Sequence, residues 1–158
     1  MRQRFANKRV LITGGASGMG KLMATEIAEQ GGLLILMDIN GQGLEEMNAA
    51  ISQKGGTINT YFCDISKPEM VEFYIKRVYD ELGDIDILIN NAGGVTGKNI
   101  LDTSPEEMRR TMDVNTLGPM YLIRQVLPRM IERDAGHIVN IASAAGLIGT
   151  ARLADYSA

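Results

Sequence analysis

The chain has 158 residues, a single cysteine and a formal net charge of −3. One thiol excludes a disulfide framework, and a slightly acidic chain with scattered basic residues excludes an electrostatic nucleic-acid surface. No run approaches the ~20 consecutive apolar residues of a membrane span, so we expect a soluble, cytoplasmic protein without membrane or nucleic-acid partners.

Short apolar segments bounded by turn residues recur along the chain and are predicted to form strands. Most are nearly continuous in apolar character, which is typical of parallel strands covered by helices on both faces. The predicted strands are residues 10–12, 33–37, 58–63, 85–89 and 137–141. Segments with apolar residues at helical spacing separate them, so the sequence predicts a series of βα units.

Several helix ends can be placed from local signals. Ser66 and Ser104 are each followed by a glutamate three residues later, the pattern of a capping box at a helix start. Gly31 and Gly55 follow helical segments, where a left-handed residue commonly ends a helix.

Such a series predicts an α/β fold, a single doubly wound domain over residues 1–158. The expected sheet is parallel, in the strand order 3-2-1-4-5, between two helical layers. Ligands of these sheets bind beyond the carboxyl ends of the strands, beside the first strand. The glycine-rich residues 13–20 fall at that point.

Residues 13–20, Thr-Gly-Gly-Ala-Ser-Gly-Met-Gly, join the first strand to a helix. Gly14 permits a tight turn, Gly18 lets the backbone approach the pyrophosphate of a dinucleotide, and Gly20 allows close packing of the helix. The free N–H groups at the helix start face the phosphates. We assign cofactor contacts to Gly14, Ser17, Gly18, Met19 and Gly20.

Asp38 ends the second predicted strand, where a carboxylate can accept hydrogen bonds from the adenosine ribose. The same charge repels a 2′-phosphate, and no arginine within the loop compensates it. We therefore expect NAD(H) to be favoured over NADP(H). The alternative is a surface aspartate that opens a turn with Asn40 and Gly41.

The spacing Thr-Gly-x-x-x-Gly-x-Gly resembles the short-chain dehydrogenase/reductase family, and Asn-Asn-Ala-Gly at residues 90–93 resembles its second hallmark. The likeness continues to the last residue. It implies a Rossmann-type fold whose cofactor is lined on the adenosine side by Asn91, Ala92 and Gly93. It also implies that Asp64, followed by Ile65, contacts the adenine.

The same resemblance implies hydride transfer between a nicotinamide and a secondary alcohol or ketone. The family's catalytic Asn, Ser and Tyr match Asn115, Ser143 and Tyr156. Ser143 would bind the substrate oxygen, Asn115 would hold a water, and Tyr156 would be the acid or base. A tyrosine has an ordinary pKa of about 10, so this role needs a nearby positive charge. Without the motifs, these three residues would be interpreted as an Asn on a helix surface, a Ser that caps a helix and an exposed Tyr.

Pro119 has no N–H, so the carbonyl of Asn115 loses its helical donor. We expect a kink there, with that carbonyl free to accept from a relay water. The alternative is that one helix ends at Gly118 and another begins at Pro119.

The family's catalytic Lys stands four residues after the Tyr, and the chain ends at Ala158, two residues before that position. We therefore expect a domain that is incomplete at its C-terminus relative to the family, with very low activity by itself. Lys98 and Arg152 are expected to be solvated loop residues rather than substitutes. An unpaired strand edge and uncovered apolar surface would favour a homo-oligomer.

Residues 36–40 and 114–119 look most like the branch that acts on steroids and retinoids, which implies a small lipophilic alcohol or ketone as substrate. A catalytically silent NAD(H)-binding or assembly module is the alternative. Residues 90–93 and 155–158 disfavour a third hypothesis, a methyltransferase on a related sheet. His137 is the only histidine, and with no second His or Cys nearby we expect no metal site.

Overall fold

The computed structural model describes residues 3–158 and contains a five-stranded parallel sheet. Its strand order, β3-β2-β1-β4-β5, confirms the predicted topology. The strands are β1 (Arg9–Thr13), β2 (Leu33–Asp38), β3 (Thr57–Phe62), β4 (Ile87–Asn90) and β5 (His137–Asn140). The parallel order brings the carboxyl ends of β1 and β4 side by side, which positions the loops that follow them.

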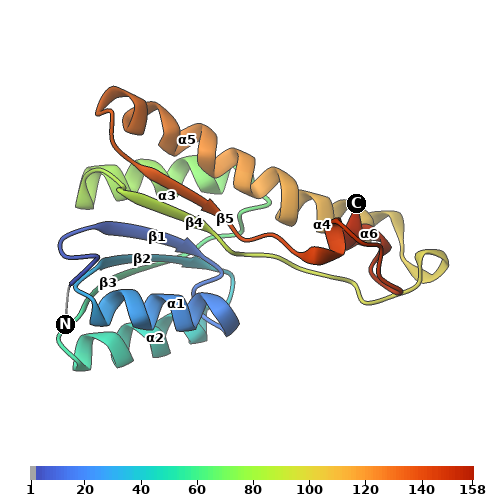
Figure 1. Ribbon diagram of the computed structural model, residues 1–158, viewed down its shortest axis with the longest axis horizontal. Coiled ribbons are helices and arrows are strands. Elements are labelled where there is room, and N and C mark those ends of the chain that lie inside the picture. Colours follow the sequence, from blue (N-terminus) through green and yellow to red (C-terminus); the bar gives the residue numbers. More distant parts are fainter. Residues whose placement is uncertain (1–2) are drawn as a thin grey trace.

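Helices lie on both sides of the sheet. Figure 1 shows α1 and α2 on one face and α3 and α5 on the other, with α4 and α6 beyond the carboxyl ends of the strands. The helices are α1 (Gly18–Glu29), α2 (Gly41–Gln53), α3 (Pro68–Leu82), α4 (Pro105–Met112), α5 (Gly118–Glu132) and α6 (Ala154–Ser157). None of the described helices is long and apolar enough to cross a bilayer.

Successive residues of β1 enter two separate cores. Leu11 packs in the cluster built with α3 and α5, whereas Val10 and Ile12 pack in the cluster built with α1 and α2. All three side chains are fully buried, and each such burial stabilises the fold by about 1.5–3 kcal/mol. A strand that is covered on both faces needs apolar residues at consecutive positions, which explains the continuous apolar runs.

All five predicted strands differ from the observed ones by one or two residues at one or both ends. The fourth begins at Ile87 rather than at residue 85. Ile85 is buried in the core before the strand begins, and the side chain of Asp86 binds the backbone of Arg9. The Asp86 carboxylate accepts the Arg9 N–H at 2.9 Å. The third ends at Phe62, so Cys63 lies just past it.

The predicted helix ends differ in outcome. Gly31 and Gly55 adopt φ values of 84° and 77°, which confirms left-handed residues after α1 and α2. Ser104 starts α4 with a complete capping box. The predicted cap at Ser66 is wrong: α3 is preceded by Lys67, and the Ser66 hydroxyl instead donates to Asp64 Oδ1 at 2.7 Å.

The segment between α4 and α5 is a π-helical turn, Asp113–Leu117. Gly118 donates its N–H to the carbonyl of Asp113, five residues back. The hydrogen-bond ladder is therefore irregular just before Pro119, where a kink is expected, and α5 begins at Gly118 rather than at Pro119. A Cβ on Gly118 would lie 2.7 Å from Ile65 Cδ1, so glycine lets the start of α5 approach the core.

Candidate functional site

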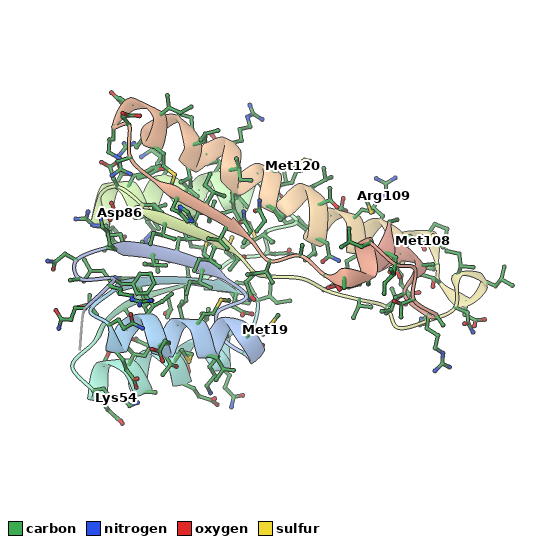
Figure 2. All side chains as sticks on the ribbon, in the orientation of Figure 1. Met19, Lys54, Asp86, Met108, Arg109 and Met120 are labelled. Carbon is green, nitrogen blue, oxygen red and sulfur yellow. The ribbon has the colours of Figure 1, made fainter. Side chains whose placement is uncertain are left out.

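An open cleft of about 840 Å³ lies at the carboxyl ends of β4 and β5, against the start of α1. Figure 2 labels two of its lining residues, Met19 at the start of α1 and Met120 on α5. Seven of the residues that the sequence assigns to the site line this cleft. They are Met19, Asn91, Ala92, Gly93, Asn115, Ser143 and Tyr156.

The glycine-rich loop has the backbone conformation that its glycines allow. Gly14 and Gly18 have φ values of 65° and 51°, which L-residues rarely adopt. A Cβ on Gly18 would meet nothing within 4 Å, so its backbone faces open space. A Cβ on Gly20 would collide with the carbonyl oxygen of Gly14 and lie 2.7 Å from Asn91 Nδ2. Gly20 therefore serves close packing of α1 on the loop itself.

The loops after β1 and β4 are joined by hydrogen bonds between Thr13 and the Asn-Asn-Ala-Gly segment. The buried Thr13 Oγ1 accepts the N–H groups of Asn91 at 3.1 Å and Ala92 at 3.0 Å. Asn91 Nδ2 donates to the carbonyls of Thr13 and Gly14 at 3.0 and 3.2 Å. Sequence reasoning noted Thr13 only as the start of the motif and assigned it no contact.

Asp38 ends β2 with both carboxylate oxygens engaged. Oδ2 accepts the Ala16 N–H and Oδ1 accepts the Asn40 N–H, each at 2.9 Å. Beside these partners lies an opening of about 460 Å³ whose lining includes Ser17, Gly18 and Lys21. Lys21, which directly follows the loop, is the basic residue that an expectation based on arginines within the loop leaves out.

Asp64 and Ile65 do not line the cleft. Asp64 lines a separate opening of about 950 Å³ between the start of α3 and α4. Ile65 is only 4% exposed and packs against Gly118. The structure thus brings these two residues beside the π-helical turn rather than into the cleft.

Two of the three residues that match the catalytic pattern have hydrogen-bond partners nearby. Asn115 exchanges two hydrogen bonds with the backbone of Gly94. Ser143 Oγ accepts the Ala145 N–H at 3.1 Å, so it also caps a short helical turn. Tyr156 is half-buried on α6, and its hydroxyl has no hydrogen-bond partner among the described residues.

Asp155 is a site residue that sequence reasoning did not single out. Asp155 lines the cleft and is 8% exposed, and its carboxylate accepts hydrogen bonds from the hydroxyls of Thr111 and Thr96. These donors, first of all Thr111, hold the pKa of Asp155 below its ordinary value despite burial. In the sequence, its place directly before Tyr156 was the available sign that Asp155 belongs to the site. The threonines that bind Asp155 lie 44 and 59 residues away along the chain.

The two basic residues considered near the site lie elsewhere. Lys98 pairs with Glu107 at 2.6 Å, and neither Lys98 nor Arg152 lines the cleft. Within residues 3–158, no group of three or more His, Cys, Asp or Glu side chains is placed to hold a metal ion.

Comparison with known proteins gives one family. Residues 8–158 match the family model described as short chain dehydrogenase. The chain is 45% identical to human epidermal retinol dehydrogenase 2 over 158 residues, which cover 99% of the chain and 51% of that protein. It is 39% identical to human 17-beta-hydroxysteroid dehydrogenase 13, covering 98% of the chain and 52% of that protein. The chain thus spans about half the length of these curated relatives.

Solved structures share the fold. A crystal structure of NAD+-bound xylitol dehydrogenase superposes with a TM-score of 0.91 at 32% identity, over 97% of this chain and 59% of that one. A metagenomic short-chain oxidoreductase in complex with NADP has a TM-score of 0.91 at 29% identity, over 97% and 70% of the two chains. The neighbours therefore include structures with either dinucleotide.

Proposed function

Because the chain belongs to the short-chain dehydrogenase family, we propose that it binds NAD(H) and takes part in hydride transfer between the nicotinamide and a secondary alcohol or ketone. The observation that carries the proposal is the single cleft lined by Asn91, Asn115, Ser143 and Tyr156 beside the start of α1. Members of this family are oxidoreductases. The chain covers about half of its curated relatives, so reaction and substrate are proposals for this chain.

The glycine-rich loop supports pyrophosphate binding. Gly18 turns its backbone toward open space, where a side chain would otherwise stand in the way of the phosphates. It begins α1, a helix of 12 residues with no acidic residue in its first turn. The free N–H groups and the positive helix end favour an anion there. We assign this contact to Ser17, Gly18 and Met19, with Gly14 and Gly20 shaping the loop.

Asp38 supports a preference for NAD(H). Each of its carboxylate oxygens accepts one backbone N–H and has a further lone pair that a ribose hydroxyl can use. The negative charge opposes a 2′-phosphate, whereas the ammonium of Lys21 in the adjoining opening favours one. We propose that Asp38 dominates, because backbone donors fix its carboxylate in place. Asn91, Ala92 and Gly93 complete the proposed adenosine side, whereas Asp64 and Ile65 lie beside the π-helical turn, outside the cleft.

The chemical step follows from the polar groups of the cleft. Bound NAD+ supplies the hydride acceptor. Ser143 and Tyr156 are proposed to hydrogen-bond the substrate oxygen. In alcohol oxidation Tyr156, as a tyrosinate, takes the hydroxyl proton of the alcohol, and in ketone reduction the Tyr156 hydroxyl gives that proton back. The side-chain amide of Asn115 is occupied by Gly94, so its backbone carbonyl is the group proposed to hold a water in the proton path.

The cleft supports a lipophilic substrate. Its apolar lining includes Met19, Val95, Met112, Met120, Ile123 and Ile141. Methionine side chains adapt to irregular apolar ligands. Two of the relatives are named for retinol and hydroxysteroid dehydrogenation. We propose a secondary or allylic alcohol on a lipophilic skeleton.

The proposal is tested by titration calorimetry of the chain with NADH and NADPH, followed by turnover assays with NAD+ and a panel of lipophilic alcohols. We expect NADH to bind at least about tenfold more tightly, equivalent to about 1.4 kcal/mol. In Lys21→Ala, NADPH binding should weaken further while NADH binding persists. Absence of binding to either dinucleotide would refute the proposal.

A catalytically silent NAD(H)-binding module is the second candidate. Among the described residues that line the cleft, only Asp155 has a charged side chain, and its charge is negative. A negative group near Tyr156 does not stabilise a tyrosinate, which the proton transfer requires. Binding of NADH without turnover on any alcohol of the panel would favour this module over the enzyme.

A further inference from the structure

Asp155 joins three segments that are far apart in the sequence. Its Oδ2 accepts the hydroxyl of Thr111 on α4 at 2.7 Å, and its Oδ1 accepts the hydroxyl of Thr96, in the loop after β4, at 3.0 Å. Thr111 and Asp155 are both buried. Both oxygens of the carboxylate therefore hold a hydroxyl from a different part of the chain.

The helix that carries Tyr156 has little support of its own. α6 has four residues, and Leu153 before it provides no side-chain cap. Its backbone bonds are those of Tyr156 and Ser157 to the Leu153 carbonyl, at 3.2 and 2.8 Å. A helix this short is not stable in water without tertiary contacts. Its position must come from the elements that it touches.

Those contacts come from α4 and from the short helical turn Ala144–Gly146. In Figure 2, α6 lies next to the part of α4 that bears Met108 and Arg109, and the Thr111 hydrogen bond joins the two helices directly. Removing that bond would leave a buried carboxylate short of a donor, which is costly. The position of Tyr156 relative to the cleft is thus tied to Thr111 through the residue beside it.

We propose that Asp155 is a positioning residue, which holds Tyr156 in the cleft by binding the hydroxyls of Thr96 and Thr111. The proposal rests on the proposed function only in giving Tyr156 a role in proton transfer. The carboxylate acts through geometry and not through its charge. An amide can replace the carboxylate. The Thr111 hydroxyl can donate its hydrogen bond to the Glu107 carbonyl, which lies 3.2 Å from Oγ1. The Thr111 oxygen can then accept a hydrogen bond from the Nδ2 of an asparagine.

The test compares disruptive and conservative variants of the 158-residue chain. Asp155→Ala and Thr111→Val remove the hydrogen bond, whereas Asp155→Asn and Thr111→Ser keep a partner in place. Asp102→Asn is the matched control, because Asp102 is an exposed carboxylate whose side-chain partner is Asn99 at 3.4 Å. Two readouts are needed: NMR amide exchange of Tyr156 and Ser157, and kcat alongside the affinity for NADH.

In Asp155→Ala and Thr111→Val we expect exchange of these two amides to rise at least about tenfold, the scale of a lost hydrogen bond to a charged group. We expect kcat to fall by a similar factor while NADH affinity is unchanged. Asp155→Asn, Thr111→Ser and Asp102→Asn should stay within about threefold of wild type.

Other outcomes overturn the proposal. Unchanged exchange in both disruptive variants would show that α6 does not depend on this contact. An equal loss in NADH affinity and kcat would indicate a general structural role. A loss in Asp155→Asn as large as in Asp155→Ala would assign the effect to charge. If wild type binds NADH without turnover, the proposed reaction fails, while amide exchange still decides the positioning role. If Asp155→Ala does not fold, Thr111→Val carries the test.

Discussion

Asn115 and Gly94 exchange two hydrogen bonds: Asn115 Oδ1 accepts the Gly94 N–H, and Asn115 Nδ2 donates to the Gly94 carbonyl, each at 2.8 Å. This amide-to-backbone pair joins the π-helical turn to the loop after β4. The π-helical turn changes which residues face the cleft, and the two hydrogen bonds with Gly94 hold Asn115 at the cleft wall. The side chain of Asn115 therefore shapes the cleft wall, which is a structural role beside the catalytic one that its motif implies.

The first prediction follows from this pair. Asn115→Asp keeps an acceptor for the Gly94 N–H but places a second oxygen against the Gly94 carbonyl. We expect the free energy of unfolding to fall by about 1–2 kcal/mol, measured by urea denaturation followed by circular dichroism. Asn48→Asp makes the same change at an exposed position of α2 and should cost less than about 0.5 kcal/mol. Equal stability of Asn115→Asp and wild type would show that the pair contributes nothing.

The second prediction concerns the glycine-rich loop. Alanine normally stabilises a helix relative to glycine by about 1 kcal/mol, but in Gly20→Ala the new Cβ would overlap the Gly14 carbonyl oxygen. We expect destabilisation by about 1–3 kcal/mol and loss of NADH binding in calorimetry. The matched control is Gly41→Ala at the start of α2, where the nearest atom lies at an ordinary 3.8 Å.

In that control the sign should reverse, with stability equal to wild type or higher. If Gly20→Ala is as stable as Gly41→Ala and still binds NADH, the loop is more adaptable than the close approach of Gly14 and Gly20 indicates.

The sheet could be predicted because its determinants are local. Most strands are nearly continuous apolar runs that two helical layers must cover, and right-handed crossovers leave few strand orders. The cleft could be predicted only in part. The motifs identify Asn115, Ser143 and Tyr156, but the hydroxyls that hold Asp155 come from residues 44 and 59 positions away. No local pattern carries such a long-range pairing.

Ser66 and Ser104 show where a local pattern is insufficient. Both stand before a proline-containing first turn with a glutamate three residues later, yet only Ser104 forms the box. The difference is the position of the proline: both helices begin at it, and Ser104 directly precedes Pro105, whereas Lys67 stands between Ser66 and Pro68. Ser66 therefore lies one residue outside the cap position, where its N–H and hydroxyl both donate to Asp64 Oδ1 at 3.0 and 2.7 Å.

This difference gives the third prediction. Ser104→Ala removes the acceptor of the Glu107 N–H, at 3.2 Å, and should lower the free energy of unfolding by about 1 kcal/mol. Ser66→Ala removes no helix cap and should cost clearly less. Thermal or urea unfolding of both variants checks the order. A larger loss in Ser66→Ala would mean that its bond with Asp64 matters more to α3 than capping matters to α4.

The fourth prediction concerns Cys63, the single cysteine of the chain. It is 1% exposed, and burial, aided by the nearby Asp64 carboxylate, raises the pKa of its thiol from 9.0 to about 12. The native chain at pH 8 should therefore react with a thiol reagent such as DTNB only through opening of the structure. Urea should expose one rapidly reacting thiol. Fast reaction of the native chain would contradict the burial.

The same pKa shift makes stability depend on alkaline pH. Because the folded state holds the Cys63 proton more tightly than the unfolded state, its contribution is complete below pH 9 and is lost as pH rises from 9 through about 12. Burial likewise raises the pKa of Tyr61 from 10.0 to about 12, helped by its hydrogen bond to Glu81. The Tyr61 contribution therefore declines only above pH 10. Urea unfolding between pH 8 and 10 separates the two: wild type should lose stability there, whereas Cys63→Ala should stay nearly level. A parallel decline in Cys63→Ala would place the alkaline sensitivity in another group.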